Sequence, residues 1–175
     1  MPWADHLYAC DAKWWDQNIA DVSDNFIGKK WIQNCEKQKE NDKLHFNAAK
    51  KHELNIVYGR DSVGLGSDVI HYASNSGYQA INLAYLWGAS LIVLLGYDMQ
   101  KTGGEAHFFG DHPSGLANGP DFNSIIPKFD PLAKELAAEG VEVINCTRQT
   151  ALKCFKRQDL EAVLQSLSAQ GRVST

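Results

Sequence analysis

The sequence lacks the simple signatures of several large protein classes. Basic residues are not in excess: the 175 residues carry a formal net charge of −4, which argues against a nucleic-acid-binding protein with a broad basic face. No apolar run reaches membrane-spanning length, and the N-terminus lacks the basic and then apolar order of a signal peptide. We therefore expect a soluble, cytoplasmic protein that binds neither nucleic acid nor membrane.

Clusters of residues that form disulfides or bind metals are also missing. The four cysteines are widely spaced and include no C-x-x-C pair, so we expect reduced thiols. The best candidate for a metal site is the pair His107 and His112, with Asp111 between them. It lacks a third strong ligand at a fixed spacing and a predicted helix to set its geometry. We expect no metal and no resident cofactor.

Glycine is absent where a dinucleotide-binding fold usually needs it. The stretch His6–Cys10 is short and mostly apolar and predicts a parallel strand, yet the residues that follow, Asp11 to Trp15, contain no glycine. A dinucleotide fingerprint is therefore excluded. Trp14 and Trp15 are predicted to open a short helix toward Ile19, and packing of both indoles is favoured over stacking of one on a base.

Residues 74–99, with the sequence SNSGYQAINLAYLWGASLIVLLGYDM, carry the clearest structural signal. Apolar residues recur at the i, i+3, i+4, i+7 spacing of one helical face. With Asn75 or Ser76 as the cap and Gly88 as the stop, this spacing predicts a helix. The unbroken apolar run Leu91–Leu95 follows at once and is typical of a central parallel strand.

The remaining elements complete an α/β pattern. We predict strands at Lys30–Cys35, Leu44–Asn47, Asn55–Tyr58 and Val141–Cys146, and helical segments at Asp130–Gly140, Ala151–Phe155 and Asp159–Leu167, with Asp130 as a cap. Together they predict a single domain over residues 1–175. Its fold class is α/β, with an open, mainly parallel Rossmann-like sheet, helices on both faces and a long lid loop at residues 99–120.

The candidate site lies at the carboxyl edge of that sheet. Ser76 and Gly77 stand at a helix N-terminus, which favours an anion, and Gly77 lets a ligand approach the backbone. Asp98 comes just after a strand, where open α/β sheets bind their ligands. Asn145 and Thr147 follow the next strand, so we expect them on the same rim.

Two loops offer further polar groups. The lid contains His107 and His112, which can reach over the pocket as acid, base or phosphate partner. The loop Gly59–Asp68 can cradle a phosphate through Gly64 and Gly66, but it has neither the lysine nor the spacing of a P-loop.

The 74–99 segment resembles the sialyltransferase-like proteins, a family that includes bacterial sialyltransferases and uncharacterised phage proteins. The resemblance extends more loosely over PWADHLYACDAKWW, HFFGDHP and GVEVINCTRQTALKCF, and it is closest to the phage members. It implies a Rossmann-like sheet, with Ser76-Gly77 against the phosphate of a nucleotide and Gly96 and Asp98 bordering the same pocket. Family members carry a further strand and a Gly-Pro-Ser-like turn ahead of the PWAD stretch, which this N-terminally shortened sequence lacks.

These observations define the residues expected to contact a ligand, while no catalytic residue is assigned. The set is Asp11, Trp14, Asn75, Ser76, Gly77, Tyr78, Gly96, Tyr97, Asp98, Met99, His107, His112, Asn145 and Thr147.

Three functions stay open at this stage. The favoured one is a binder of a nucleotide or nucleotide-derived phosphorylated ligand, without catalysis. Its partner would be a nucleotide-type small molecule, and a phage protein of this kind would sequester a host nucleotide immune signal in the host cytoplasm. The second is a sialyltransferase-like glycosyltransferase that uses a nucleotide sugar. The third is a structural or assembly protein, and a homo-oligomer is compatible with all three.

Overall fold

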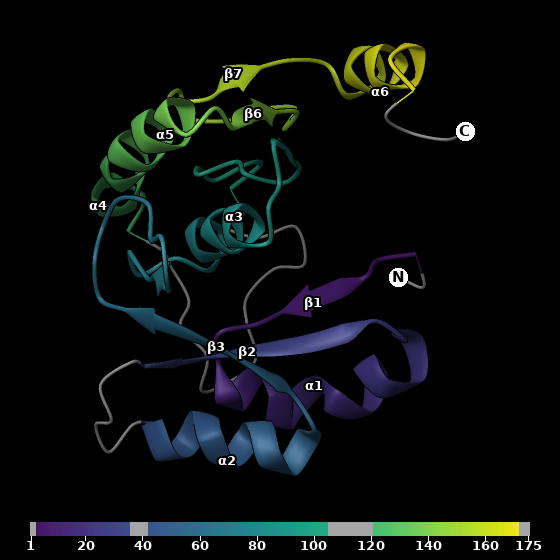
Figure 1. Ribbon diagram of the computed structural model, residues 1–175, viewed down its shortest axis with the longest axis vertical. Coiled ribbons are helices and arrows are strands. Elements are labelled where there is room, and N and C mark those ends of the chain that lie inside the picture. Colours follow the sequence, from purple (N-terminus) through teal and green to yellow (C-terminus); the bar gives the residue numbers. More distant parts are fainter. Residues whose placement is uncertain (1–2, 36–41, 105–120, 172–175) are drawn as a thin grey trace.

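The computed structural model describes residues 3–35, 42–104 and 121–171, which form an α/β structure (Figure 1). In chain order the elements are β1 (His6–Tyr8), α1 (Ala12–Asn25), β2 (Lys29–Cys35), α2 (Asp42–His52), β3 (Asn55–Arg60), β4 (Ile70–His71), α3 (Ser76–Leu86), β5 (Leu91–Leu94), α4 (Phe122–Ile125), η1 (Ile126–Lys128), α5 (Phe129–Ala138), β6 (Glu142–Asn145), β7 (Lys156–Arg157) and α6 (Leu160–Ala169).

All the strand pairs in the described residues are parallel. One sheet has the order β1-β2-β3-β4, and a second sheet has the order β5-β6-β7. Figure 1 shows α1 and α2 on one side of the first sheet and α3 on the other. The predicted open, parallel, Rossmann-like arrangement is therefore confirmed.

Side chains on opposite faces of β1 show how the helices cover this sheet. Leu7 packs into the core beneath α1 and α2, together with Trp15 and Ile32. Its neighbour Tyr8 points to the other face, where its hydroxyl donates to Oε1 of Gln79 in α3 at 2.6 Å. Successive strand residues point to opposite faces, so α1 and α3 cover opposite faces of the sheet.

A second core joins α3 to β5, β6 and α5. Tyr78 and Ile81 of α3 pack with Ile92 of β5 and with Phe129 of α5. The ring of Tyr78 meets that of Phe129 edge-on, with 5.2 Å between centroids. On the other face of β5 and β6, α6 covers a small apolar cluster through Val163. Helices therefore lie on both faces of this sheet too.

The predicted helix at the centre of the chain is confirmed with its cap. Oδ1 of Asn75 accepts from the backbone N–H of Tyr78 at 2.9 Å, and α3 begins at Ser76. Gly88 ends the helix in the left-handed region, at φ +86°, where glycine is favoured. Leu91–Leu94 then forms a strand almost as predicted.

Three sequence predictions of secondary structure were wrong. Leu44–Asn47 is not a strand but part of α2, because a crossover helix must connect the parallel strands β2 and β3. Leu44 is 51% exposed, so it does not mark a core face. Ala151–Phe155 is irregular rather than helical. Asp130 does not cap α5, because the helix continues directly from η1 and begins at Phe129.

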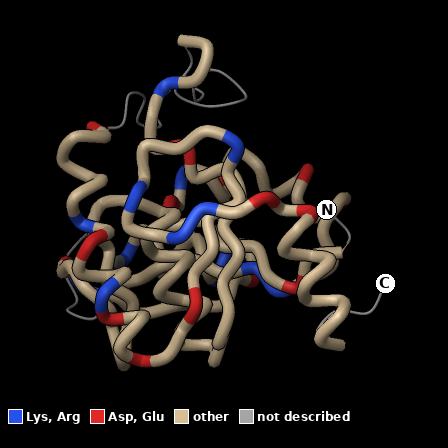
Figure 2. The backbone as a smooth tube through the Cα atoms, turned by 90° about the horizontal axis from the view of Figure 1, so that it is seen from above, with Lys and Arg blue, Asp and Glu red and all other residues tan. Residues whose placement is uncertain are grey.

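The first strand and helix also differ from prediction in length. β1 ends at Tyr8, before Cys10, and α1 continues to Asn25, well beyond Ile19. All four cysteines are free, as predicted. Among the described helices none is long and apolar enough to cross a membrane. Figure 2 shows basic and acidic positions interspersed along the described backbone.

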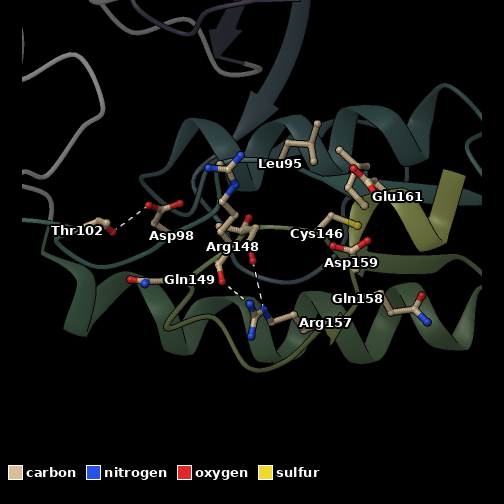
Figure 3. A pocket seen from close by; sticks show the side chains of 13 residues that line it. Leu95, Asp98, Thr102, Cys146, Arg148, Gln149, Arg157, Gln158, Asp159 and Glu161 are labelled. Carbon is tan, nitrogen blue, oxygen red and sulfur yellow. Dashed lines mark hydrogen bonds between the residues drawn. The ribbon is translucent and has the colours of Figure 1, made fainter.

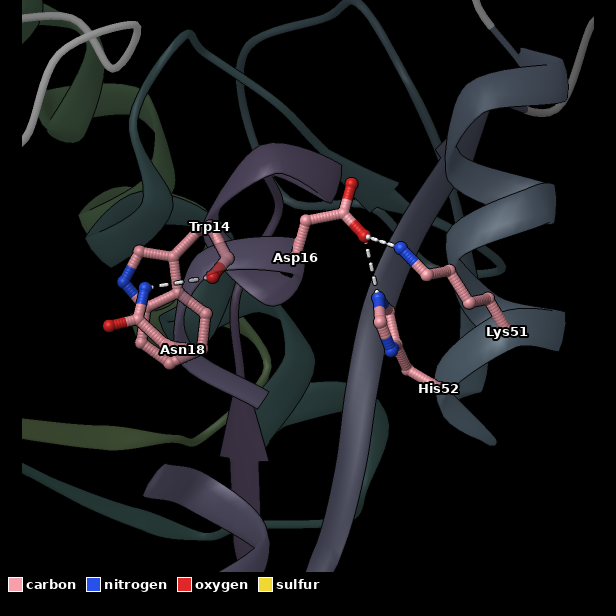
Figure 4. Close-up of polar contacts among 5 residues, drawn as sticks. All are labelled: Trp14, Asp16, Asn18, Lys51 and His52. Atoms are coloured by element: carbon pink, nitrogen blue, oxygen red, sulfur yellow. Dashed lines mark hydrogen bonds and ion pairs between the residues drawn. The ribbon is translucent and has the colours of Figure 1, made fainter. Parts of the chain in front are cut away.

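An ion-pair cluster ties α1 to the end of α2 (Figure 4). Oδ1 of Asp16 lies 2.7 Å from Nζ of Lys51 and 2.7 Å from Nε2 of His52. The hydrogen bond from Lys51, followed by the one from His52, lowers the pKa of the Asp16 carboxyl. A lowered carboxyl pKa adds stability above the unfolded-state pKa, and this stability is lost as the pH falls through the folded-state pKa.

We predict that Asp16→Asn lowers the free energy of unfolding at neutral pH by a few tenths of a kcal/mol. The effect is this small because water screens an ion pair whose carboxylate side chain is 42% exposed. Urea unfolding at neutral pH and at acidic pH measures the difference, which should shrink as the carboxyl protonates below about pH 4. Asp24→Asn, at an exposed position of the same helix, is the control and should show neither effect. A loss that stays constant with pH would contradict the assignment.

Candidate functional site

A pocket of about 930 Å³ opens at the carboxyl ends of β5 and β6 (Figure 3). The segment after β5 supplies Leu95, Gly96 and Asp98, and the segment after β6 supplies Cys146, Thr147 and Arg148. Residues from β7 to the first turn of α6 complete the lining. The pocket therefore lies where parallel α/β sheets bind their ligands.

Hydrogen bonds between two loops fix this wall. The backbone N–H of Tyr97 donates to Oγ1 of Thr147 at 2.9 Å, and Oγ1 of Thr150 donates to the carbonyl of Tyr97 at 2.6 Å. The N–H of Ala151 donates to the carbonyl of Asp98 at 2.8 Å. Asn145 is fully buried, and its Oδ1 accepts from the N–H of Thr147 at 3.0 Å. The loop after β5 is thus held against the loop after β6.

Two arginines contribute to the pocket in different ways. Arg157 donates from Nε to the carbonyl of Thr147 at 3.3 Å and from its terminal nitrogen to the carbonyl of Arg148, so its guanidinium braces the loop. Arg148 is exposed, and its guanidinium has no hydrogen bond or ion pair with any residue that the structure describes. In Figure 3 it extends between Asp98 and Leu95. Arg148 is therefore available to an anion in the pocket.

Carboxylates share the pocket with these arginines. Oδ2 of Asp98 accepts from the hydroxyl of Thr102 at 3.1 Å. Oδ1 of Asp159 caps α6 by accepting from the N–H of Ala162 at 3.1 Å, and Glu161 lies in the first turn of that helix. Leu95 and Leu160 add apolar surface. The lining suits a ligand that combines an anionic group, hydroxyl groups and an apolar ring.

The N-terminus of α3 adjoins the pocket through Tyr97. The hydroxyl of Tyr97 donates to the carbonyl of Gly77 at 3.0 Å, and a Cβ added to Gly77 would lie 2.9 Å from the Tyr97 ring. The close approach that Gly77 permits is thus made by Tyr97, in the space where we expected a ligand. Burial raises the pKa of Tyr97 well above its usual range, so its hydroxyl stays protonated.

Ser76 at the same helix start faces the end of β1. Its Oγ lies 3.1 Å from Sγ of Cys10, and burial, as the largest cause, raises the pKa of the Cys10 thiol. Burial therefore keeps Cys10 in the thiol form, as expected for a cysteine that packs. Ser76 itself remains exposed.

The structure distributes the predicted contact residues over several places. Gly96, Asp98 and Thr147 line the pocket, and Tyr97 and Asn145 form the wall behind them. Met99 packs against the core of α3 and α5. Asp11 is the N-cap residue of α1, between β1 and that helix, and Trp14 lies in the first turn of α1, where it packs edge-on against Trp15. His107 and His112 lie outside the described residues.

Tyr78 has a role inside the protein rather than at the pocket. It is fully buried, and its hydroxyl donates to the carbonyl of Gly64 at 2.8 Å. Burial raises its pKa to about 12.

The loop Gly59–Asp68 is also held from inside. The side-chain amide of Asn82 bonds both backbone groups of Gly66, and the N–H of Leu65 donates to Glu135 at 2.5 Å. Together with the N–H of Gly64, which bonds to Tyr78, these contacts use the donors that we expected to cradle a phosphate.

Sequence reasoning missed both pocket arginines. Arg148 comes directly after Thr147 in the loop after a strand. The position at a strand end that identified Thr147 could therefore have identified Arg148 as well. Arg157 belongs to β7, a strand of two residues that is defined by its pairing with β6. No local periodicity marks so short a strand.

Comparisons of the chain with protein-family models, with curated proteins and with solved structures find no match. The resemblance to the sialyltransferase-like family therefore stays an expectation, and function has to be argued from the pocket.

We predict that Thr150→Val destabilises the protein by about 2 kcal/mol, because it leaves buried groups of Tyr97, Asn145 and Leu152 without their partner. Urea unfolding measures the loss. Thr150→Ser keeps the hydroxyl and should lose less than half as much. Equal losses in the two variants would show that packing of the methyl group, and not the hydroxyl network, stabilises this wall.

Proposed function

We propose that the protein binds a nucleotide or a nucleotide-derived phosphorylated ligand in this pocket, and that it binds without catalysis. The observation that carries the proposal is the Arg148 guanidinium, which lies at the carboxyl edge of parallel strands without a partner among the described residues. A phosphate is the ligand group that best matches the planar, fixed fork of an arginine.

The rest of the lining supports a nucleotide over inorganic phosphate. Asp98 and Glu161 offer carboxylate oxygens that accept hydrogen bonds from ribose hydroxyls. Leu95 is 57% exposed and offers apolar surface to a base. Since the pocket also contains the carboxylate of Asp159, a bare anion would meet repulsion that a hydroxyl-rich ligand avoids.

Binding alone needs complementary contacts, whereas transfer of a sugar needs a positioned base and an acceptor site as well. The role that fits binding is sequestration: a phage-encoded protein of this kind would lower the free concentration of a host nucleotide signal. The second candidate is a glycosyltransferase that uses a nucleotide sugar, and the observation in its favour is the Asp98 carboxylate in the same pocket as Arg148.

We predict that Arg148→Gln weakens binding of the best ligand from a panel of nucleotide sugars, cyclic nucleotides and ADP-ribose by 10-fold or more. Loss of a charge-assisted hydrogen bond to phosphate costs about 1.5–3 kcal/mol, which corresponds to roughly 10- to 100-fold. Calorimetry measures the affinity. Lys134→Gln on α5 removes a cation at an exposed position outside the pocket and should leave the affinity unchanged. Failure of every compound to bind, or equal binding by wild type and Arg148→Gln, would contradict the proposal.

A second prediction separates binding from catalysis. After incubation with the panel and heat denaturation, mass spectrometry should recover the bound compound unchanged. Multiple turnovers of a nucleotide sugar into free nucleotide would establish the transferase instead. In that case Asp98→Asn should abolish turnover while Lys134→Gln keeps it.

A further inference from the structure

The charged side chains of the pocket are divided between its two ends (Figure 3). The guanidinium of Arg148 lies on the same side as Asp98. Asp159 and Glu161 lie on the other side, at the start of α6. The start of α6 therefore contributes carboxylates as its only charged groups in the pocket lining.

The charge of this acidic end extends toward the middle of the pocket. Burial, and after it the charge of Asp159, raises the pKa of the Cys146 thiol. Arg157 comes just before this end in the chain, but its guanidinium donates to the carbonyls of Thr147 and Arg148. A phosphate would be repelled at the start of α6, so the part of a ligand that binds there has to donate hydrogen bonds.

The two carboxylates at this end differ in their partners. Oδ1 of Asp159 accepts from the N–H of Ala162 at 3.1 Å and so caps α6. Glu161 is exposed, and its carboxylate makes no hydrogen bond or ion pair with any residue of the described ranges. Both oxygens of Glu161 are thus available to a ligand.

The order of groups across the pocket matches the order of groups in a nucleotide. In Figure 3 Leu95 lies between Arg148 and Glu161. When a phosphate binds Arg148, the ribose attached to it is close to Asp98, and the base can lie on Leu95. A volume of about 930 Å³ is within the range of roughly 300–1,000 Å³ of pockets that enclose a whole small ligand. Of the two carboxylates, Asp98 is thus nearer the ribose and Glu161 nearer the edge of the base.

A carboxylate distinguishes the bases by the pattern of donors on their pairing edges. It accepts hydrogen bonds and donates none, so it fits an edge with two neighbouring donors. Guanine has such an edge, because its N1–H and its N2 amino group stand side by side. Adenine and cytosine have an acceptor nitrogen next to the amino group, and uracil has a carbonyl on each side of its N–H. A carboxylate repels these acceptors.

We propose that the nucleotide bound in this pocket carries guanine, and that Glu161 selects guanine by accepting hydrogen bonds from N1–H and from the N2 amino group. This assignment, which rests on the proposed function, adds the identity of the base and the residue that determines it. Arg148 binds the phosphate whatever the base is, whereas Glu161 discriminates between bases.

The test measures the affinities of GMP, IMP, AMP, CMP and UMP for the full chain by calorimetry. These compounds share the same ribose and phosphate, so a difference between them reports the base. We expect GMP to bind about 10-fold or more tightly than AMP, CMP and UMP, because it makes charge-assisted hydrogen bonds that they lack. IMP keeps N1–H and lacks the amino group, so its affinity should lie between those of GMP and AMP.

The variant Glu161→Gln tests the role of the carboxylate itself. A glutamine amide has one acceptor next to one donor, which matches N6 and N1 of adenine and no longer matches guanine. The ratio of GMP affinity to AMP affinity should therefore fall by about 10-fold or more. Loss of negative charge alone would strengthen both nucleotides equally and leave this ratio unchanged, since GMP and AMP carry the same charge. Circular dichroism checks that the variant folds.

Glu142→Gln is the matched control, because Glu142 is exposed and lies outside this pocket, and it should leave both affinities unchanged. The outcomes separate base selection from the proposed function. If no nucleotide binds, both are wrong. If nucleotides bind and Arg148→Gln weakens them, the proposed function holds. In that case equal affinities for GMP and AMP, or a ratio that Glu161→Gln does not change, would overturn the selection of guanine alone.

Discussion

Packing of α3 against two sheets that share no strand pair among the described residues is the interaction on which the rest of this structure depends. Its N-terminal half bonds to β1 and to the loop before β4, through Gln79 and Tyr78. Its apolar side packs on β5 and α5 through Ile81. Further contacts between the two halves come from loops beside this helix, such as the hydrogen bonds from Leu65 to Glu135 and from Lys128 to the carbonyl of Ala73. The fold is thus organised around one helix where a Rossmann-like fold is usually organised around a central strand.

This use of α3 explains why polar residues are buried within it. Gln79 and Asn82 are almost fully inaccessible, and a buried amide costs free energy unless it is hydrogen-bonded. Asn82 satisfies both backbone groups of Gly66 and accepts from His71 at 2.9 Å. Gln79 accepts from Tyr8 and donates to the carbonyl of Tyr72 at 3.2 Å. These side-chain amides therefore join α3 to β1, to β4 and to the residues on either side of β4.

The sequence allowed the regular elements to be predicted where the signal is local. The cap at Asn75, the stop at Gly88 and the apolar run from Leu91 determine α3 and β5 from neighbouring residues alone. Prediction failed where tertiary contacts decide the structure. Residues 44–47 contain two apolar side chains, Leu44 and Phe46, and this pattern fits either a strand or a helix. The segment is helical because β2 and β3 pair in parallel and need a crossover helix between them. The same limit explains why β7, and with it Arg157, escaped notice.

The candidate site shows the same difference between residues that local sequence signals identify and residues that only tertiary contacts place. Asp98 and Thr147 were expected at the rim because strand ends can be read from the sequence, and both line the pocket. From its neighbours in the chain, Gly77 was predicted to leave space for a ligand beside the backbone. Its partner is Tyr97, 20 residues away, and that contact exists only after β5 has packed beside α3. A glycine at a helix start indicates that something approaches closely, but the sequence does not say whether it is a ligand or a side chain.

The start of α3 and the pocket also bear on one another. The hydroxyl of Tyr97 donates to the carbonyl of Gly77 at the start of α3, and its backbone N–H donates to Thr147 in the pocket wall. Tyr97 therefore connects the helix on which the two sheets pack to the wall of the candidate site. A ligand that orders this wall also holds the start of α3 in place, and because coupling between sites is reciprocal, a change at the start of α3 should alter the affinity for that ligand.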